Sequence, residues 1–281
     1  MALPADFDLD DFVKGTLAED LGTGGDVTSS ATIAENARFT AQMNARQPIV
    51  VAGIEIAAAF FRALDGDVKI DTLADDGDRV ERGTALMRLS GNARAMLAAE
   101  RSALNTLQHL SGIATVARTY VDAIAGTGAV LLDTRKTIPG LRALEKFAAR
   151  MGGAQNHRMR LDDGVLIKDN HVALCGGVAE AVRRAKAANT GLQVQVEVDR
   201  IDQIEPALAA GADRLLLDNM DPARLREAVR LVAGRVPLEA SGGVTLDSIR
   251  FLAETGIDFI SVGRITQSAP AVDIGLDYSI S

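Results

Sequence analysis

Six short apolar segments recur from residue 130 onward in this 281-residue chain, and segments with a helical pattern lie between most of them. Buried parallel strands that alternate with amphipathic helices are typical of α/β folds, in which the helices cover the faces of the sheet. The pattern therefore predicts either a βα barrel or a doubly wound sheet. The predicted strands are Val130–Thr134, Val165–Lys168, Val194–Val198, Arg214–Leu217, Leu238–Ala240 and Phe259–Val262.

The residues at the strand ends distinguish these two architectures. Polar residues or glycines follow strand after strand, as in Lys168, Glu197, Asp218, Ser241–Gly243 and Ser261–Arg264. The carboxyl ends of parallel strands gather at one end of the sheet, where ligands bind. Groups on so many successive strands converge on one site only if the sheet closes or nearly closes. With only six clear strands, we expect an open, incomplete βα barrel.

Positive charge is concentrated at three of these strand ends. The segment from Asp133 to His171 holds eight Lys and Arg residues against five Asp and Glu residues, in a chain whose net charge is −8. One such cation at a strand end is commonly just solvated. Three groups together in an acidic protein indicate binding of a small polyanion. The groups are Arg135–Lys136, His157–Arg158 and Lys168.

Two further features complete a predicted anion site. Glycines follow the last two strands, in Ser241–Gly243 and Val262–Gly263, where barrels often bind a phosphate through backbone N–H groups. Glu197 and Asp218 follow neighbouring strands, and such a pair is suited to a ribose diol or to Mg²⁺ carried with phosphates. The three histidines and Cys175 lack the spacing of zinc ligands, so no structural metal site is expected.

Composition excludes several classes of protein. The single cysteine, Cys175, rules out an intrachain disulfide framework and is typical of a reducing compartment. The N-terminal residues lack the pattern of a secretory signal, and no apolar run is long enough to cross a bilayer. A pI near 5.0 argues against general nucleic-acid binding. We therefore expect a cytoplasmic protein without nucleic-acid or membrane partners.

The first part of the chain has a different pattern of predicted helices and strands. A helix is predicted over residues 6–20, a glycine-rich turn over 22–26, extended chain over 38–51 and a second helix over 53–64. Short strands separated by glycine turns follow over 67–90, in a pattern that resembles a lipoyl or biotinyl carrier hammerhead. A carrier needs an acceptor lysine, and no lysine occurs between Lys69 and Lys136. The sequence therefore excludes the carrier function but not the hammerhead shape.

A long helix is predicted from Ala93 to about Gly126, capped by Asn92 and interrupted near Gly112. Arg101 lies beside the apolar stripe of this helix, four residues after Leu97. Its guanidinium either extends from the edge of the stripe into solvent or points across an interface into an anionic site.

The basic segment closely resembles the signature of the quinolinate phosphoribosyltransferases, the carboxylating nicotinate-nucleotide pyrophosphorylases. The resemblance rests on DTRKT, PGLR, LEK, NHR and VLIKDNH between Asp133 and His171. It extends upstream to ERSALN and LSGIAT, and downstream to VEV, LDNM, EASGGV and SVG, so that it covers nearly the whole chain.

This resemblance implies an α/β fold with two domains. We assign residues 1–116 to an N-terminal α/β sandwich of hammerhead-like shape, 117–270 to the open barrel that holds the catalytic site, and 271–281 to a C-terminal tail. It also implies a homodimer with shared sites at the subunit interface, and leaves open a higher assembly of dimers.

The family's functional residues match positions of this chain. Arg135, Lys136, His157, Arg158 and Lys168 match residues that hold the carboxylates of quinolinate and the phosphates of 5-phosphoribosyl 1-pyrophosphate (PRPP). Arg101 matches a residue from the neighbouring subunit, and Glu197 and Asp218 match acids at the ribose and Mg²⁺, which arrives with PRPP and has no fixed protein site. The loops expected to hold the 5′-phosphate are Ser241, Gly242 and Gly243, and Val262, Gly263 and Arg264. Thr134 completes the predicted substrate contacts, and Lys136, Lys168, Glu197 and Asp218 are the predicted catalytic residues. Arg264 departs from the small residue expected there.

The implied reaction suits these side chains. The pyridine nitrogen of quinolinate attacks C1 of PRPP, pyrophosphate leaves, and the 2-carboxylate departs as CO₂ to give nicotinate mononucleotide, a step of NAD biosynthesis. The transition state resembles an oxocarbenium ion, so positioning and electrostatic stabilisation dominate over acid–base catalysis.

Three alternatives remain open at this stage. Lys168 could form a Schiff base, as in an aldolase, with Arg135 and Arg158 depressing its pKa. A paralogue associated with molybdenum transport shares DTRKT and HR, although the intact segments 156–158 and 168–171 favour the quinolinate enzyme. A non-enzymatic phosphate-ligand sensor on a barrel scaffold has no specific feature in its favour.

Overall fold

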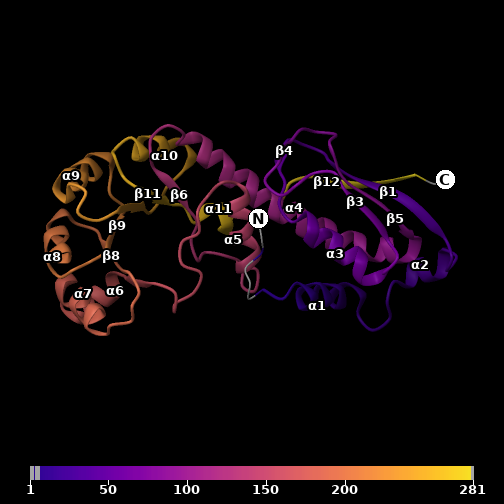
Figure 1. Ribbon diagram of the computed structural model, residues 1–281, viewed down its shortest axis with the longest axis horizontal. Helices are drawn as coiled ribbons and strands as arrows, with labels where there is room; N and C mark the ends of the chain where they lie inside the picture. The colour runs from indigo at the N-terminus through magenta and orange to yellow at the C-terminus, as the bar shows by residue number, and fades with distance from the viewer. Residues whose placement is uncertain (1–2, 4–6, 280–281) are drawn as a thin grey trace. The chain divides into compact units, whose positions relative to one another are not determined.

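The computed structural model describes residue 3 and residues 7–279, which form two compact units (Figure 1). The first unit comprises residues up to 117 together with 143–153 and the C-terminal segment from 268. The second comprises 118–142 and 154–267. The predicted segments 1–116 and 271–281 each include residues outside the described part of the chain, as does the predicted start of the first helix at residue 6.

A four-stranded antiparallel sheet forms the centre of the first unit. Its order is β12 (Ile274–Ser279), β1 (Arg38–Ala45), β5 (Ala85–Asn92) and β3 (Lys69–Thr72), and β2 (Ile49–Val50) pairs separately with β4 (Arg79–Val80). Alternate residues of β1 are buried, as expected for a sheet with one face on the core. The segment that we assigned to a C-terminal tail therefore supplies an edge strand of this sheet.

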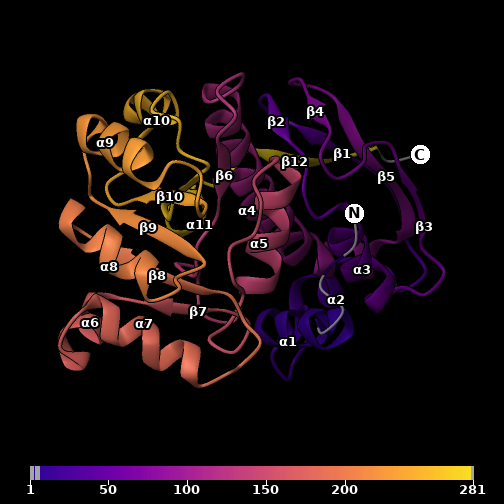
Figure 2. The same cartoon turned by 60° about the vertical axis from the view of Figure 1, so that its left-hand side comes forward.

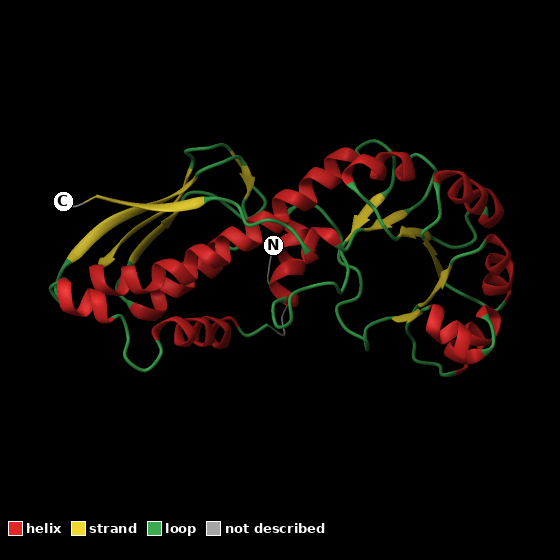
Figure 3. Cartoon of the chain, turned by 180° about the vertical axis from the view of Figure 1, so that it is seen from behind, coloured by secondary structure: helices red, strands yellow, loops and turns green. Residues whose placement is uncertain are grey.

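Among the described residues, five helices belong wholly or mostly to the first unit. They are α1 (Leu9–Leu21), α2 (Val27–Thr32), α3 (Ile54–Leu64), the first part of α4 (Ala93–Ala123) and α5 (Arg142–Met151). Figure 3 shows α4 and α3 running beneath the strands of the sheet. The buried residues Phe60 and Phe61 of α3 and Met96 of α4 contribute to this core.

Helix α4 corrects one prediction, because it runs from Ala93 to Ala123 without the interruption expected near Gly112. A β-carbon at Gly112 would lie 2.2 Å from the carbonyl oxygen of Pro270. Glycine is thus needed for close packing of the segment before β12 and does not break the helix. The predicted cap is confirmed, since Oδ1 of Asn92 accepts a hydrogen bond from the Ala95 N–H at 3.1 Å.

Six parallel strands form the sheet of the second unit. Their spatial order is β6 (Val130–Leu132), β11 (Phe259–Ser261), β10 (Leu238–Ser241), β9 (Arg214–Asp218), β8 (Val194–Val198) and β7 (Val165–Ile167). All six occur where the apolar runs predicted them. Within the described residues, the edge strands β6 and β7 do not pair with each other, although Gln155 forms an isolated bridge with Leu132. The predicted open βα barrel is therefore confirmed.

Helices lie on the outer side of this curved sheet (Figure 2). They are α6 (Asp169–Cys175), α7 (Val178–Ala187), α8 (Ile204–Ala209), α9 (Pro222–Val232) and α10 (Leu246–Ala253). The short helix η1 (Ile201–Gln203) precedes α8, and α11 (Arg264–Gln267) follows β11. Proline is favoured at the first position of a helix, so the sequence predicts a helix that begins at Pro139, and this prediction was wrong. Gly140 has φ +85°, outside the helical region, and α5 begins only at Arg142. No helix in the described part of the chain is long and apolar enough to cross a membrane.

Candidate active site

A cavity of about 750 Å³ opens at the carboxyl ends of the six barrel strands. Every predicted site residue except Arg101 lines it. These are Thr134, Arg135, Lys136, His157, Arg158, Lys168, Glu197, Asp218, Ser241, Gly242, Gly243, Val262, Gly263 and Arg264. All of them belong to the second unit.

The alternation of side chains along each strand explains how these residues meet. Successive residues of a strand point to opposite faces, so every second residue faces the barrel interior. On β9 and β10 the neighbouring residues Asp218 and Ser241 pair in register, and both line the cavity. Glu197 on β8 faces the same cavity. In register Glu197 pairs with Leu216, two residues before Asp218, so the three side chains line the cavity at two successive levels of the strands.

Cations also line the cavity. Nη1 of Arg158 donates to the carbonyl of Gly164 at 2.9 Å, which anchors one end of its guanidinium. Burial and the nearby charge of Arg135 lower the pKa of Arg158. Nε of Arg135 is buried and meets no hydrogen-bond acceptor among the described residues. Two guanidinium groups that repel each other in a partly dry cavity favour the binding of an anion.

Lys136 is held by its main chain. Its N–H donates to Oγ1 of Thr134 at 3.0 Å, and its carbonyl accepts from Oγ1 of Thr266 at 2.8 Å. A β-carbon at Gly263 would lie 2.7 Å from Cδ of Lys136, so glycine at this position leaves room for the lysine side chain. The loops after β6 and β11 therefore fit together around the lysine stem.

The pKa values of the two predicted acids, Glu197 and Asp218, are both raised above their ordinary values. Burial, followed by the charge of Asp218, raises the pKa of Glu197, and Lys168 opposes that shift. Burial also raises the pKa of Asp218, while the hydrogen bond from Asn219 and the charge of Lys168 lower it. Two carboxylates that cost free energy to ionise side by side are suited to a cation or to hydroxyl donors.

Two comparisons with known proteins identify the family of this chain. The family model described as quinolinate phosphoribosyl transferase, N-terminal domain, matches residues 26–111, and the C-terminal domain model matches 113–277. The chain belongs to the quinolinate phosphoribosyltransferase family. The nicotinate-nucleotide pyrophosphorylase [carboxylating] of Mycobacterium leprae is 42% identical over 95% of this chain and 96% of its own length. The probable enzyme of that name from Bacillus subtilis is 41% identical over 94% and 91%.

Solved structures of the family have the same fold. The nicotinate-nucleotide pyrophosphorylase of Francisella tularensis superposes with a TM-score of 0.93 at 40% identity, covering 99% of this chain and 100% of that one. The chain is thus a phosphoribosyltransferase, as its resemblance to this family implied.

Arg101 is the one predicted site residue that does not line the cavity. It is exposed on α4, in the first unit. This exposed position agrees with both orientations predicted for its guanidinium, into solvent or across an interface into an anionic site.

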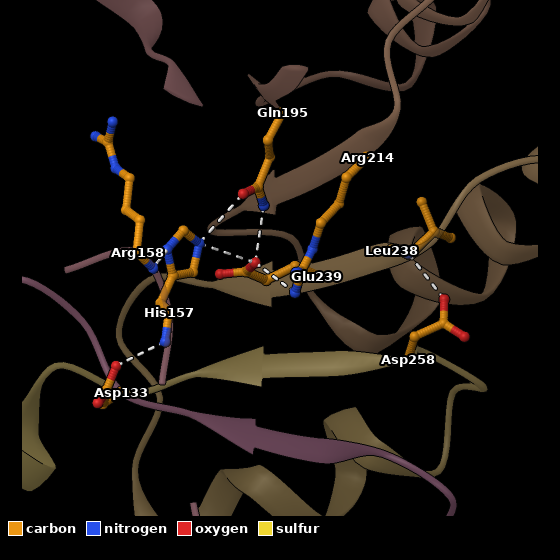
Figure 4. Close-up of polar contacts among 8 residues, drawn as sticks. All are labelled: Asp133, His157, Arg158, Gln195, Arg214, Leu238, Glu239 and Asp258. Carbon is orange, nitrogen blue, oxygen red and sulfur yellow. Dashed lines mark hydrogen bonds and ion pairs between the residues drawn. The ribbon is translucent and has the colours of Figure 1, made fainter. Parts of the chain in front are cut away.

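Sequence reasoning missed a set of polar residues deeper in the barrel, namely Gln195, Arg214 and Glu239 (Figure 4). Each lies an even number of residues before a cavity-lining residue of its own strand: Gln195 two before Glu197, Arg214 four before Asp218, and Glu239 two before Ser241. A polar residue at an inward position of an otherwise apolar strand was the signal that could have found them.

Proposed function

We propose that this chain transfers the phosphoribosyl group of PRPP to quinolinate in NAD biosynthesis, releasing pyrophosphate and CO₂ and forming nicotinate mononucleotide. The observation that carries the proposal is one cavity, in a chain of this family, lined by a cation cluster, two acids and two glycine loops. A dicarboxylate that meets a polyphosphate needs such an arrangement, because cations must offset their mutual repulsion.

We assign the two substrates to different residues of the cavity. We assign the quinolinate carboxylates to Arg135, Arg158 and Lys168, with Lys136 toward the pyrophosphate. Bidentate guanidinium contacts orient a planar carboxylate, which places the pyridine nitrogen for attack on C1. We assign the 5′-phosphate of PRPP to the backbone of Ser241–Gly243 and Val262–Arg264. Loops after the last strands of a barrel commonly bind phosphate in this way.

Glu197 and Asp218 are assigned to the ribose hydroxyls and to Mg²⁺ carried by PRPP. Mg²⁺ prefers one or two carboxylates together with substrate phosphates, and this pair of neighbouring acids matches that preference. The raised pKa values of both acids fit this assignment, because a bound cation would relieve the cost of ionising them.

We also propose that the protein is a homodimer that works in the cytoplasm, and that Arg101 completes the cavity of the partner subunit. Exposure of Arg101 on α4 leaves its guanidinium available for such a contact. The single cysteine supports a reducing compartment.

One assay tests the reaction. The purified chain is incubated with PRPP, Mg²⁺ and quinolinate labelled in its 2-carboxyl group, and labelled CO₂ and the mononucleotide are measured together. Equimolar release of both is expected. Nicotinate in place of quinolinate should give far less mononucleotide, since it lacks one of the two carboxylates. Turnover of nicotinate at the quinolinate rate would contradict the assignment.

A further inference from the structure

A network of hydrogen bonds and ion pairs at the wall of the cavity joins three strands to the loop that carries Arg158 (Figure 4). Glu239 of β10 is fully buried and lies at its centre. Nη2 of Arg214 is 2.8 Å from Oε2 of Glu239, and Nε2 of Gln195 donates to the same oxygen at 2.8 Å. Nε2 of His157 lies 3.4 Å from that oxygen and 3.2 Å from Oε1 of Gln195.

These contacts determine the proton position on His157. Because the amide nitrogen of Gln195 donates to Glu239, its oxygen is the atom that faces His157. Nε2 of the imidazole must therefore carry a proton. On the other side of the ring, the main-chain N–H of Arg158 donates to Nδ1 at 2.8 Å, so that Nδ1 must be bare. The network selects the neutral Nε2–H tautomer.

The charge on Glu239 is what orients Gln195. Arg214, whose Nη2 lies 2.8 Å from Oε2 of Glu239, stabilises the ionised form of this buried carboxylate. The guanidinium of Arg214 lies over the ring of Phe259, 3.9 Å from its centroid, which fixes the cation in place. An ionised carboxylate only accepts hydrogen bonds, so it dictates which end of the Gln195 amide faces His157.

We propose that Glu239 is a positioning residue for phosphoribosyl transfer: through Gln195 it fixes the tautomer and orientation of His157, and through His157 the main chain of Arg158. The inference rests on the proposed function, in which Arg158 holds a quinolinate carboxylate. A cation held by such a support orients substrate more accurately than one on a free loop.

Three substitutions test this inference by steady-state kinetics. Glu239→Gln removes the charge but keeps the shape, Glu239→Asp keeps the charge, and Gln195→Met keeps the buried Glu239–Arg214 pair while removing the amide. Glu239→Gln and Gln195→Met should each raise KM for quinolinate about tenfold, the scale typical of losing a supporting hydrogen bond, with KM for PRPP almost unchanged. Glu239→Asp should restore part of the loss. If Glu239→Gln fails to fold, Gln195→Met carries the test, because it leaves no unpaired buried charge.

A matched control is available elsewhere in the chain. Glu145 is equally buried, and its Oε1 lies 2.9 Å from Nε2 of His109, within the first unit. Glu145→Gln should lower stability in a similar way while leaving the ratio of the two KM values at the wild-type level. An equal change of both KM values in Glu239→Gln and Gln195→Met, as expected for general loosening of the barrel, would overturn the inference.

A spectroscopic readout is independent of activity. Long-range ¹H–¹⁵N spectra of the imidazoles, with the His157 signals assigned from a His157→Gln variant, should show a protonated Nε2 and a bare Nδ1 in the wild type. Glu239→Gln should shift them toward a mixture of tautomers. Unchanged His157 shifts in that variant would refute positioning by Glu239. Normal spectra in a wild type that fails to turn over quinolinate would instead contradict the proposed function.

Discussion

Gly242 and Asn219 pack so closely at the ends of β10 and β9 that a β-carbon on Gly242 would lie 2.2 Å from Oδ1 of Asn219. Both residues have positive φ, +93° and +54° respectively. Gly242→Ala should therefore displace the loop assigned to the 5′-phosphate. We expect KM for PRPP to rise at least tenfold, which corresponds to about 1.4 kcal/mol of lost binding. Steady-state kinetics with varied PRPP would measure it.

Gly211 provides the control for this substitution. Its φ of +91° is nearly the same, but a β-carbon there would meet only Cε of Lys186 at 3.7 Å, an ordinary contact. Gly211→Ala carries the backbone strain of a positive φ, about 1–2 kcal/mol, without the collision in the cavity. It should lower thermal stability and leave KM for PRPP at the wild-type value. Similar kinetics for the two variants would argue against a steric cause.

The strand ends were predictable because apolar runs and their polar termini depend on local sequence. Lys168, Glu197 and Asp218 were all placed at the cavity by that reasoning alone. The supporting residues were not, because the partner of Glu239 is set by strand order and register, which bring Arg214 of the neighbouring strand beside it. Register is a property of the whole sheet and cannot be read from one strand.

Gly112 shows that a helix, too, can depend on packing that the local sequence does not reveal. A glycine within a helical pattern weakens the helix on intrinsic propensity, and an interruption was the natural prediction. The helix continues because close packing against Pro270, a residue distant in sequence, requires a position without a side chain. Tertiary packing overrides propensity at this position, and no local signal distinguishes the two cases.

Glu197→Gln and Asp218→Asn should impair PRPP binding much more than quinolinate binding, because both acids are assigned to the ribose and Mg²⁺. Losing a charge-assisted contact costs about 1.5–3 kcal/mol, so PRPP affinity should fall at least tenfold. Calorimetry with each ligand alone, in the presence of Mg²⁺, separates the two effects. Equal losses for both ligands, with the fold intact, would count against the assignment.

The same two variants should stabilise the ligand-free protein at neutral pH. The pKa values of Glu197 and Asp218 are raised above their ordinary values of 4.5 and 3.8, chiefly by burial. Between the ordinary and the raised values the folded state binds more protons than the unfolded state, so stability falls as pH rises through that window. The amides of Glu197→Gln and Asp218→Asn do not ionise, so these variants avoid this loss of folding stability. Their advantage, on the scale of roughly 0.5–2 kcal/mol for single stabilising substitutions, should vanish below the ordinary pKa values. Thermal unfolding across pH would measure it, and an advantage that persists in acid would exclude this cause.

Lys168 should act as a charge and not as a nucleophile, since it faces the cavity together with other cations and two acids. Lys168→Arg should therefore retain part of the activity, although the guanidinium geometry differs, whereas Lys168→Ala should lose nearly all of it. Single-turnover assays of both variants would show the difference. Recovery of a borohydride-reduced substrate adduct on Lys168 would instead establish a Schiff base.

Arg101 should complete the site of a neighbouring subunit. In a two-fold dimer each subunit lends its own Arg101 and receives that of its partner. Arg101→Ala and Lys168→Ala subunits, each inactive alone, can be unfolded and refolded together in equal amounts. A mixed dimer then carries both lesions in one site and none in the other. Random pairing should restore activity to about a quarter of the wild-type level. If Arg101 serves its own barrel, every site keeps one lesion, and activity stays at the level of the single variants although mass measurement confirms mixed dimers.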